Sequence, residues 1–304
     1  ARHAFGDDRL IVEKFVPRAH HVEFQILADG HGHTVHLFER ECSVQRRYQK
    51  IIEETPSPLL NPDLRARMGA AAVAAARAVG YVNAGTVEFI VDPDTRAFYF
   101  LEMNTRLQVE HPITELVTGL DLAQWQIRIA AGEPFPYRQE DFQQQGHAME
   151  CRVYAEDPAN GFLPSTGELL LARFPQGPSI RVDAGVESGD AITHHYDPLM
   201  AKIIVHAEDR DAAIRRMTYA LRQTAIHGVI TNTAFLLDVL AHPDFQAGRA
   251  DTKWVDRVLA DWRPEAGPED LILAALALSD LLPATAQPVA APAGPDPYSP
   301  WKRG

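Results

Sequence analysis

The sequence has few cysteines and no long apolar run. Only Cys42 and Cys151 occur among 304 residues, which excludes a disulfide framework and fits a reducing compartment. Both are expected to be core residues rather than nucleophiles. The longest apolar stretch, 271–282, is broken by Ser279 and Asp280 and falls short of the roughly 18 residues of a membrane span. We therefore expect no membrane association.

Positive charge is also scarce. The chain carries 41 acidic and 29 basic residues, for a formal net charge of -12. Proteins that bind nucleic acid non-specifically are more often basic, so we expect no nucleic-acid partner. The common nucleotide loops G-x-x-x-x-G-K-[ST] and G-x-G-x-x-G are missing, as are H-E-x-x-H, G-x-S-x-G and C-x-x-C. These absences exclude the usual short phosphate loops and several hydrolase signatures.

What is present is a mixture of strand and helix patterns typical of an α+β fold. Residues 21–27 alternate polar and apolar, which predicts a half-buried strand, and Asp29-Gly30 predicts a hairpin with 34–40. Asn61 and Pro62 begin an alanine-rich helix that Gly80 ends. The remaining expected strands are 10–16, 82–91, 98–103, 148–155, 168–173, 180–184 and 201–205, and the remaining helices are 120–131, 210–223, 231–240 and 253–261.

Composition marks two boundaries along the chain. A polar, glutamine-rich stretch at 137–146 separates two groups of elements. Residues 283–297 are mostly proline and alanine, which is typical of a stiff linker, and 298–304 read as the opening of another domain. The first residue is not methionine and no signal-peptide pattern follows it. We therefore expect a fragment of a longer protein.

The segment from Glu102 to Glu110 is the densest in polar chemistry. If it is extended, its even-numbered residues fall on one face with period two: Glu102, Asn104, Arg106, Gln108 and Glu110. Burying two carboxylates, two amides and a guanidinium without a ligand would be costly. The alternative is a solvated strand edge.

Glu88 favours a ligand over that alternative. It lies on the preceding predicted strand, so a hairpin can place it beside Glu102. Two adjacent carboxylates repel unless a cation separates them. With Asn104 added, all the ligands are oxygen atoms, which suits Mg²⁺ or Mn²⁺. A basic cluster at 45–50 is either an ordinary surface strand or an anion cradle that serves this site.

These residues sit in long motifs that resemble biotin carboxylases of the ATP-grasp superfamily. The similarity is carried by 42–50, 100–115, 150–158 and 195–202, and it covers Phe5 to about Trp262. The resemblance implies the C-terminal half of an ATP-grasp fold followed by a mixed sheet and helix region. It divides the chain into the end of a lid (1–16), an ATP-grasp catalytic part (17–136), a biotin carboxylase C-terminal region (147–262), and a helix, linker and following domain (263–304).

The resemblance also implies a reaction and its residues. ATP and bicarbonate would form carboxyphosphate, and CO2 would pass to a biotin held on a carrier domain. Arg106 would hold bicarbonate with Lys50 and the Val109 backbone, Glu110 would be the base, and Arg152 would stabilise the biotin enolate. The metal ligands would be Glu88, Glu102 and Asn104. The nucleotide would meet Glu13, Lys14, Phe15, Val16, His21, Gln45, Tyr48 and Ile90.

The residue types suit these roles. A guanidinium and an ammonium bind an anion through charge-assisted hydrogen bonds, a metal offsets phosphate charge, and an arginine can stabilise a developing oxyanion. Two departures stand out. Tyr48 occupies a position where the family often has histidine, and the N-terminal domain and most of the glycine-rich lid are missing. The chain could therefore be a non-catalytic fragment that binds a partner or forms a dimer interface.

The C-terminal tail bears on the kind of carboxylase. Residues 268–278, the linker and Ser299–Arg303 resemble α-subunits of acyl-CoA carboxylases, most closely the 3-methylcrotonyl-CoA type. Geranyl-, propionyl- and acetyl-CoA types are rivals, as is pyruvate carboxylase, while 150–158 argues against carbamoyl-phosphate synthetase. The expected partners are a biotin carboxyl carrier domain and a carboxyltransferase β-subunit bound after 262, in a homodimer or larger hetero-oligomer. The location would be cytoplasmic, or the mitochondrial matrix in a eukaryote.

Overall fold

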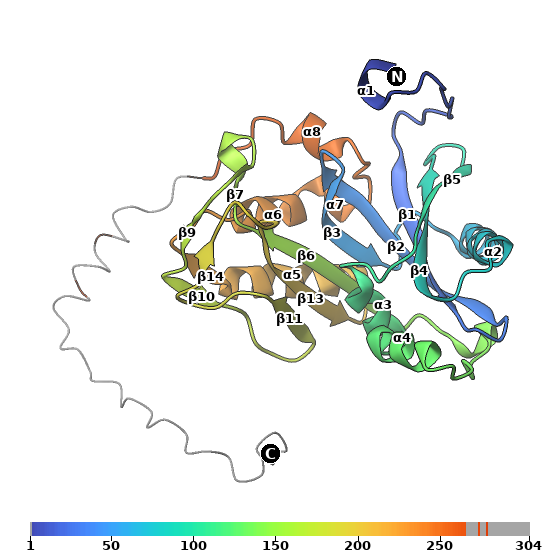
Figure 1. Cartoon of the computed structure of the whole chain (residues 1–304). Coiled ribbons are helices and arrows are strands. Elements are labelled where there is room, and N and C mark those ends of the chain that lie inside the picture. The colour runs from blue at the N-terminus through green and yellow to red at the C-terminus, as the bar shows by residue number, and fades with distance from the viewer. Residues whose placement is uncertain (1, 266–272, 274–277, 279–304) are drawn as a thin grey trace, which may run out of the picture. The chain divides into compact units, whose positions relative to one another are not determined.

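One eight-stranded antiparallel sheet organises the chain in the computed structural model, which describes residues 2–265, 273 and 278. The described residues up to Arg263 form a single unit. The strand order is β11-β13-β6-β3-β2-β1-β4-β5 (Figure 1). The strands in this sheet are β1 (His20–Ala28), β2 (Thr34–Arg46), β3 (Gln49–Thr55), β4 (Asn83–Val91), β5 (Phe98–Asn104), β6 (His147–Tyr154), β11 (Ile180–Ala184) and β13 (Leu199–Ala207).

Helices and short strand pairs surround this sheet. The small pairs are β7 (Glu156–Asp157) with β8 (Leu163–Pro164), β9 (Gly167–Glu168) with β12 (Ala191–Ile192), and β10 (Leu171–Arg173) with β14 (Ala225–His227). The helices are α1 (Arg2–Phe5), α2 (Pro62–Ala78), α3 (His111–Thr118), α4 (Leu122–Ala130), α5 (Arg210–Gln223), α6 (Thr233–Ala241), α7 (Pro243–Gln246) and α8 (Trp254–Val258), with two 3-10 turns at Gln139–Asp141 and Pro158–Asn160.

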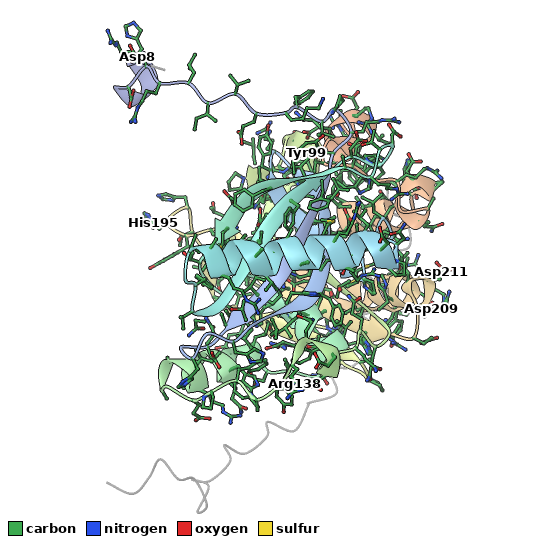
Figure 2. The ribbon with its side chains drawn as sticks, turned by 90° about the vertical axis from the view of Figure 1, so that its right-hand side faces the viewer. Asp8, Tyr99, Arg138, His195, Asp209 and Asp211 are labelled. Carbon is green, nitrogen blue, oxygen red and sulfur yellow. The ribbon has the colours of Figure 1, made fainter. Side chains whose placement is uncertain are left out.

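The apolar face of the sheet packs against helices. Val22, Phe24 and Ile26 of β1 meet Leu64 and Met68 of α2 in one buried cluster. Figure 2 looks onto this side and shows α2 lying across the strands. In the other half of the chain, β6 and β13 pack their apolar residues against α5 and α6. The cross-strand register from Val22 through Glu41 and Glu54 to Met149 puts both helix layers on the same face of the sheet.

The opposite face is polar, yet much of it is also buried. Glu23 and Gln25 of β1 alternate with the apolar residues above, and both are fully buried. Glu23 is the cross-strand partner of Arg40 on β2 and of Glu88 on β4. The prediction of a half-buried strand at 21–27 is therefore wrong in one respect. The strand and its hairpin with β2 exist, but the polar face is covered as well.

Most predicted elements are confirmed. Asn61 caps α2 by accepting a hydrogen bond from the Leu64 amide, with Pro62 in the first turn, and Gly80 follows with a positive φ. The strands at β4, β5, β6, β11 and β13 and the helices α4, α5 and α6 lie within a few residues of the predicted bounds. Cys42 and Cys151 are buried and free. The α+β fold class is confirmed.

Three expectations about local structure are wrong. Residues 10–16 form no strand, and Leu10, Ile11 and Val12 are exposed. Residues 168–173 are split between β9 and β10. The extended segment 102–110 stops at Asn104 and then bends into α3, a helix that the sequence interpretation did not include. Since Pro112 stands in the first turn of α3 and Gly119 ends it in the left-handed conformation, ordinary helix signals were present.

The glutamine-rich stretch at 137–146 separates elements but not sheets. β6 follows it directly and pairs with β3 from the preceding half. No helix among the described residues is long and apolar enough to cross a membrane. The predicted linker and the start of a following domain lie outside the described residues.

Candidate functional site

A cleft of about 470 Å³ opens on the polar face of the sheet. Residues from β1, the β2–β3 turn, β4, β5, the segment before α3 and β6 meet there. Every predicted site residue from His21 to Arg152 lines this cleft: His21, Gln45, Tyr48, Lys50, Glu88, Ile90, Glu102, Asn104, Arg106, Val109, Glu110 and Arg152. Their predicted roles remain proposals, but the fold brings these residues together.

Lys50 lies at the centre of the buried part of the cleft. The tight turn at Arg47 and Tyr48, both with positive φ, reverses the chain just before it. Its Nζ atom is 2.7 Å from Glu110 Oε1, 3.1 Å from Glu88 Oε1 and 2.5 Å from Glu23 Oε2. One ammonium group therefore connects carboxylates from three separate segments.

Burial and ion pairing oppose each other at Lys50. Burial disfavours the charged amine, but Glu23 and the other nearby carboxylates outweigh this effect and raise the pKa of Lys50 well above its ordinary value. Burial likewise disfavours ionised Glu23, but Arg40 and Lys50 hold the pKa of Glu23 below its ordinary value. The centre of the site is therefore charged, and Lys50 remains a cation.

The predicted hairpin of acidic residues is present. Glu88 and Glu102 are cross-strand partners on β4 and β5, and Asn104 Nδ2 is 3.3 Å from Glu102 Oε1. His21 Nε2 lies 2.8 Å from Glu88 Oε2. Burial would raise the pKa of Glu88, but His21 and then Lys50 lower this pKa well below its ordinary value. Two carboxylates and an amide oxygen form a donor set that fits a magnesium-type cation.

Arg152 forms the wall on the β6 side of the cleft. Its Nε donates to Glu53 Oε1 at 2.6 Å, and its terminal nitrogen donates to Glu110 Oε2 at 3.0 Å. These carboxylates raise the pKa of Arg152 although burial acts to lower it. Glu110 thus bridges Lys50 and Arg152, one carboxylate oxygen to each, and lies between the two cations that would face an anionic substrate.

Arg106 lies at the opposite, open side of the cleft. Its side chain is exposed, and its terminal nitrogen contacts Asn104 Oδ1 at 3.2 Å. Lys202 of β13 donates to the Val109 carbonyl oxygen at 2.5 Å. Arg106 is therefore free to bind a ligand, whereas the loop that contains Val109 is fixed from below.

The predicted nucleotide contacts divide into two groups. His21, Gln45 and Ile90 line the cleft, and Gln45 donates to the Cys42 carbonyl oxygen at 3.0 Å. Tyr48 also lines the cleft and is 83% exposed. Residues 13–16 do not line the cleft, since they belong to the segment that forms no strand.

Sequence reasoning missed several residues that hold the site in place. Arg40 is fully buried and donates to Glu23 Oε1 at 2.6 Å, Gln25 Oε1 at 2.7 Å and Thr114 Oγ1 at 2.9 Å. Glu53 and Lys202 position Arg152 and the Val109 loop. The alternation in β1 pointed to Glu23, but nothing in the sequence showed that Arg40 would be buried against it.

Two family models match the chain in succession. Residues 1–138 match "Carbamoyl-phosphate synthase L chain, ATP binding domain", and residues 150–257 match "Biotin carboxylase C-terminal domain". Together with the charged cleft, these matches place the chain in the biotin carboxylase family.

Named relatives agree with this assignment. The chain is 52% identical to the mitochondrial methylcrotonoyl-CoA carboxylase subunit alpha of Rattus norvegicus over 87% of the chain and 37% of that protein. It is 51% identical to the biotin carboxylase of Halalkalibacterium halodurans over 83% of the chain and 55% of that protein. The chain thus spans well under two thirds of the length of either relative.

Solved structures show the same fold. The biotin carboxylase domain of Hydrogenobacter thermophilus 2-oxoglutarate carboxylase, a dimer in complex with MgADP and bicarbonate, superimposes with a TM-score of 0.83 at 44% identity, covering 87% of this chain and 58% of that one. Pyruvate carboxylase of Rhizobium etli gives a TM-score of 0.84 at 42% identity over 89% of this chain and 26% of that one. The predicted resemblance and fold are confirmed.

Proposed function

We propose that the protein carrying this chain is a biotin carboxylase that uses ATP and bicarbonate to carboxylate biotin on a carrier domain. The observation that carries the proposal is the convergence of Lys50, Glu110 and Arg152 in the cleft, next to the cross-strand pair Glu88 and Glu102. Such a site combines a base, two fixed cations and an oxygen-ligand set in one cleft.

Each residue then has a distinct task. Lys50 and Arg106 bind bicarbonate by charge-assisted hydrogen bonds, and Glu110 accepts its proton. Glu88, Glu102 and Asn104 would hold Mg²⁺ or Mn²⁺, which offsets phosphate charge when nucleotide is bound. His21, Gln45, Tyr48 and Ile90 would contact the nucleotide, with 13–16 joining them if that segment folds over the cleft. Arg152 stabilises the enolate oxygen of biotin.

The whole protein would act within an acyl-CoA carboxylase of the 3-methylcrotonyl-CoA type. The relatedness to methylcrotonoyl-CoA carboxylase α-subunits supports this substrate over pyruvate. Its partners would be a biotin carboxyl carrier domain and a carboxyltransferase subunit, and the dimeric 2-oxoglutarate carboxylase domain supports a homodimer. We also propose the domain division at 16, 136, 147 and 262, and a subunit contact made after 262.

The test is biotin-dependent ATP hydrolysis with Mg²⁺, bicarbonate and free biotin, measured on the chain and on the complete protein. Arg106→Ala is the decisive variant because its side chain is exposed and hydrogen-bonds to the neighbouring Asn104, so the fold should be unaffected. We expect turnover that requires Arg106 in the complete protein. Bicarbonate-independent hydrolysis, or full activity of Arg106→Ala, would contradict the assignment. Turnover by the complete protein but not by this chain would support the hypothesis that the chain is a non-catalytic fragment.

A further inference from the structure

A pair of buried carboxyl groups lies next to Arg152 and does not line the cleft. Glu53 of β3 and Glu150 of β6 are cross-strand partners in the antiparallel register, and both are 0% exposed. Residues that face each other on an antiparallel pair project from the same side of the sheet, with Cβ atoms about 5 Å apart. The two carboxyl groups are therefore immediate neighbours, and the proposed reaction uses neither of them.

The hydrogen bonds of this pair are unequal. Glu53 Oε1 accepts from Arg152 Nε at 2.6 Å. Glu53 Oε2 and both carboxyl oxygens of Glu150 are buried without a hydrogen-bond donor. Leaving buried carboxylate oxygens unpaired costs free energy. A proton placed between Glu150 and Glu53 Oε2 would satisfy one oxygen of each residue at once.

The charge balance on this face of the sheet gives the same result. The cations nearest the pair already bind other carboxylates, whereas Glu150 makes no ion pair among the described residues. Arg40 pairs with Glu23, Lys50 with Glu23, Glu88 and Glu110, Arg152 with Glu53 and Glu110, and Lys202 with Asp183. Burial raises the pKa of Cys42 and lowers that of His111, so neither of these neighbours adds a charge.

Electrostatics at the pair itself is consistent with a retained proton. Burial and then the neighbouring Glu53 raise the pKa of Glu150 well above its ordinary value. Burial also raises the pKa of Glu53 to about 7, although Arg152 acts to lower it. Adjacent carboxyl groups in a site closed to water commonly hold one proton between them.

We infer that Glu53 and Glu150 share one proton at neutral pH and act as a positioning pair for Arg152. Glu53 keeps a single negative charge that fixes the guanidinium, and Glu150 serves as a neutral donor to Glu53. If both were ionised, Arg152 would face three carboxylates, counting Glu110, and its charge would be largely offset before biotin enolate forms. The kinetic consequence rests on the proposed function, but the shared proton does not.

The proton can be observed without any activity assay. Infrared spectroscopy of the ligand-free protein at neutral pH should show the C=O stretch of a protonated carboxylic acid that disappears in Glu150→Gln. The matched control is Glu54→Gln, from the opposite face of β3, because Arg210 and His147 lower the pKa of Glu54 to about 2 and keep it ionised. An unchanged spectrum in Glu150→Gln would overturn the inference.

Kinetics of biotin carboxylation by the complete protein test the positioning role. The wild type should lose kcat at alkaline pH as the shared proton leaves. Glu150→Gln should retain kcat within about threefold at neutral pH, because an amide also donates to Glu53, and its kcat should not decline at alkaline pH. Glu53→Gln should lose roughly ten- to a hundredfold in kcat, since the charge-assisted bond to Arg152 is gone. The kcat of Glu150→Ala should lie between those of Glu150→Gln and Glu53→Gln.

The outcomes separate the two hypotheses. An alkaline decline that persists in Glu150→Gln, or equal losses in Glu53→Gln and Glu150→Gln, would contradict the positioning pair. If the wild type carboxylates no biotin, the proposed function fails, while the infrared result still decides whether the proton is shared.

Discussion

At the scale of single residues, the site is a set of charges that compensate one another inside the protein. Lys50 neutralises parts of three carboxylates, and Arg152 pairs with two. Removing one partner from such a buried set is far more costly than removing an exposed ion pair. Individual substitutions should therefore report on the balance of charge as well as on chemistry.

Lys50→Met should destabilise the chain by about 3–5 kcal/mol at neutral pH, because buried carboxylates would face each other unpaired. The variant should recover part of this loss as the pH falls, since its folded state would then bind protons more readily than its unfolded state. Urea denaturation at several pH values measures both effects. Lys14→Met, at an exposed position, is the control, and a deficit that is independent of pH would contradict the expectation.

Glu54 should make the fold sensitive to acid. Its carboxylate accepts hydrogen bonds from Arg210 Nε at 2.7 Å and from His147 Nε2 at 2.8 Å. Arg210 and His147 lower the pKa of Glu54 to about 2, although burial opposes this. Because the folded pKa lies below the unfolded one, the stabilisation is complete above an unfolded pKa of about 4.3 and is lost as the pH falls toward 2. The loss should reach about 3 kcal/mol. When the free energy of unfolding is measured as the pH is lowered, it should fall less in Glu54→Gln than in the wild type.

At the scale of elements, the turn between β2 and β3 fixes where Lys50 lies. Arg47 and Tyr48 have φ values of 47° and 69°, as a two-residue hairpin turn with matching twist requires, and glycine adopts these angles with less strain. Arg47→Gly should therefore stabilise the chain by about 1 kcal/mol, measured by thermal unfolding. Arg138→Gly, where φ is -93°, should give no such gain.

The packing of α2 on the sheet depends on one glycine. A Cβ atom at Gly69 would lie 2.5 Å from His36 Nε2, and His36 is itself held against Phe24 and Phe38. Gly69→Ala would gain about 1 kcal/mol of helix propensity. We nevertheless expect net destabilisation of about 1–2 kcal/mol from the steric clash. Increased stability on chemical denaturation would show that His36 can move aside.

At the scale of the whole molecule, β5 is an edge strand with an apolar surface. Phe100 is 56% exposed, and Tyr99 and Leu101 beside it are also exposed; Figure 2 labels Tyr99 on this strand. Unpaired edges with exposed apolar residues promote association. We expect the chain to self-associate with increasing concentration and Phe100→Glu to reduce this, as measured by light scattering. Tyr219→Glu on α5 is the control, and a monodisperse wild type would contradict the expectation.

The sequence by itself determined the family, most elements and nearly all of the cleft. Long motifs specify residue types at fixed spacing, and the hairpin that joins Glu88 to Glu102 follows from local turn chemistry and strand period. Helix α2 was predictable because its cap and stop signals are local. For the same reason α3 could have been found from Pro112 and Gly119, and the error lay in extending a strand pattern past Asn104.

Only the tertiary structure decided that the polar face of the sheet is buried. Alternation in β1 is the same whether Glu23 faces water or the interior, and it became interior because Arg40, Lys50 and α3 converge on it from distant parts of the chain. The pairing of Glu53 with Glu150 likewise depends on the register between β3 and β6, which are far apart in sequence. Long-range pairing of this kind leaves no local signal, and it sets the charge state of the site.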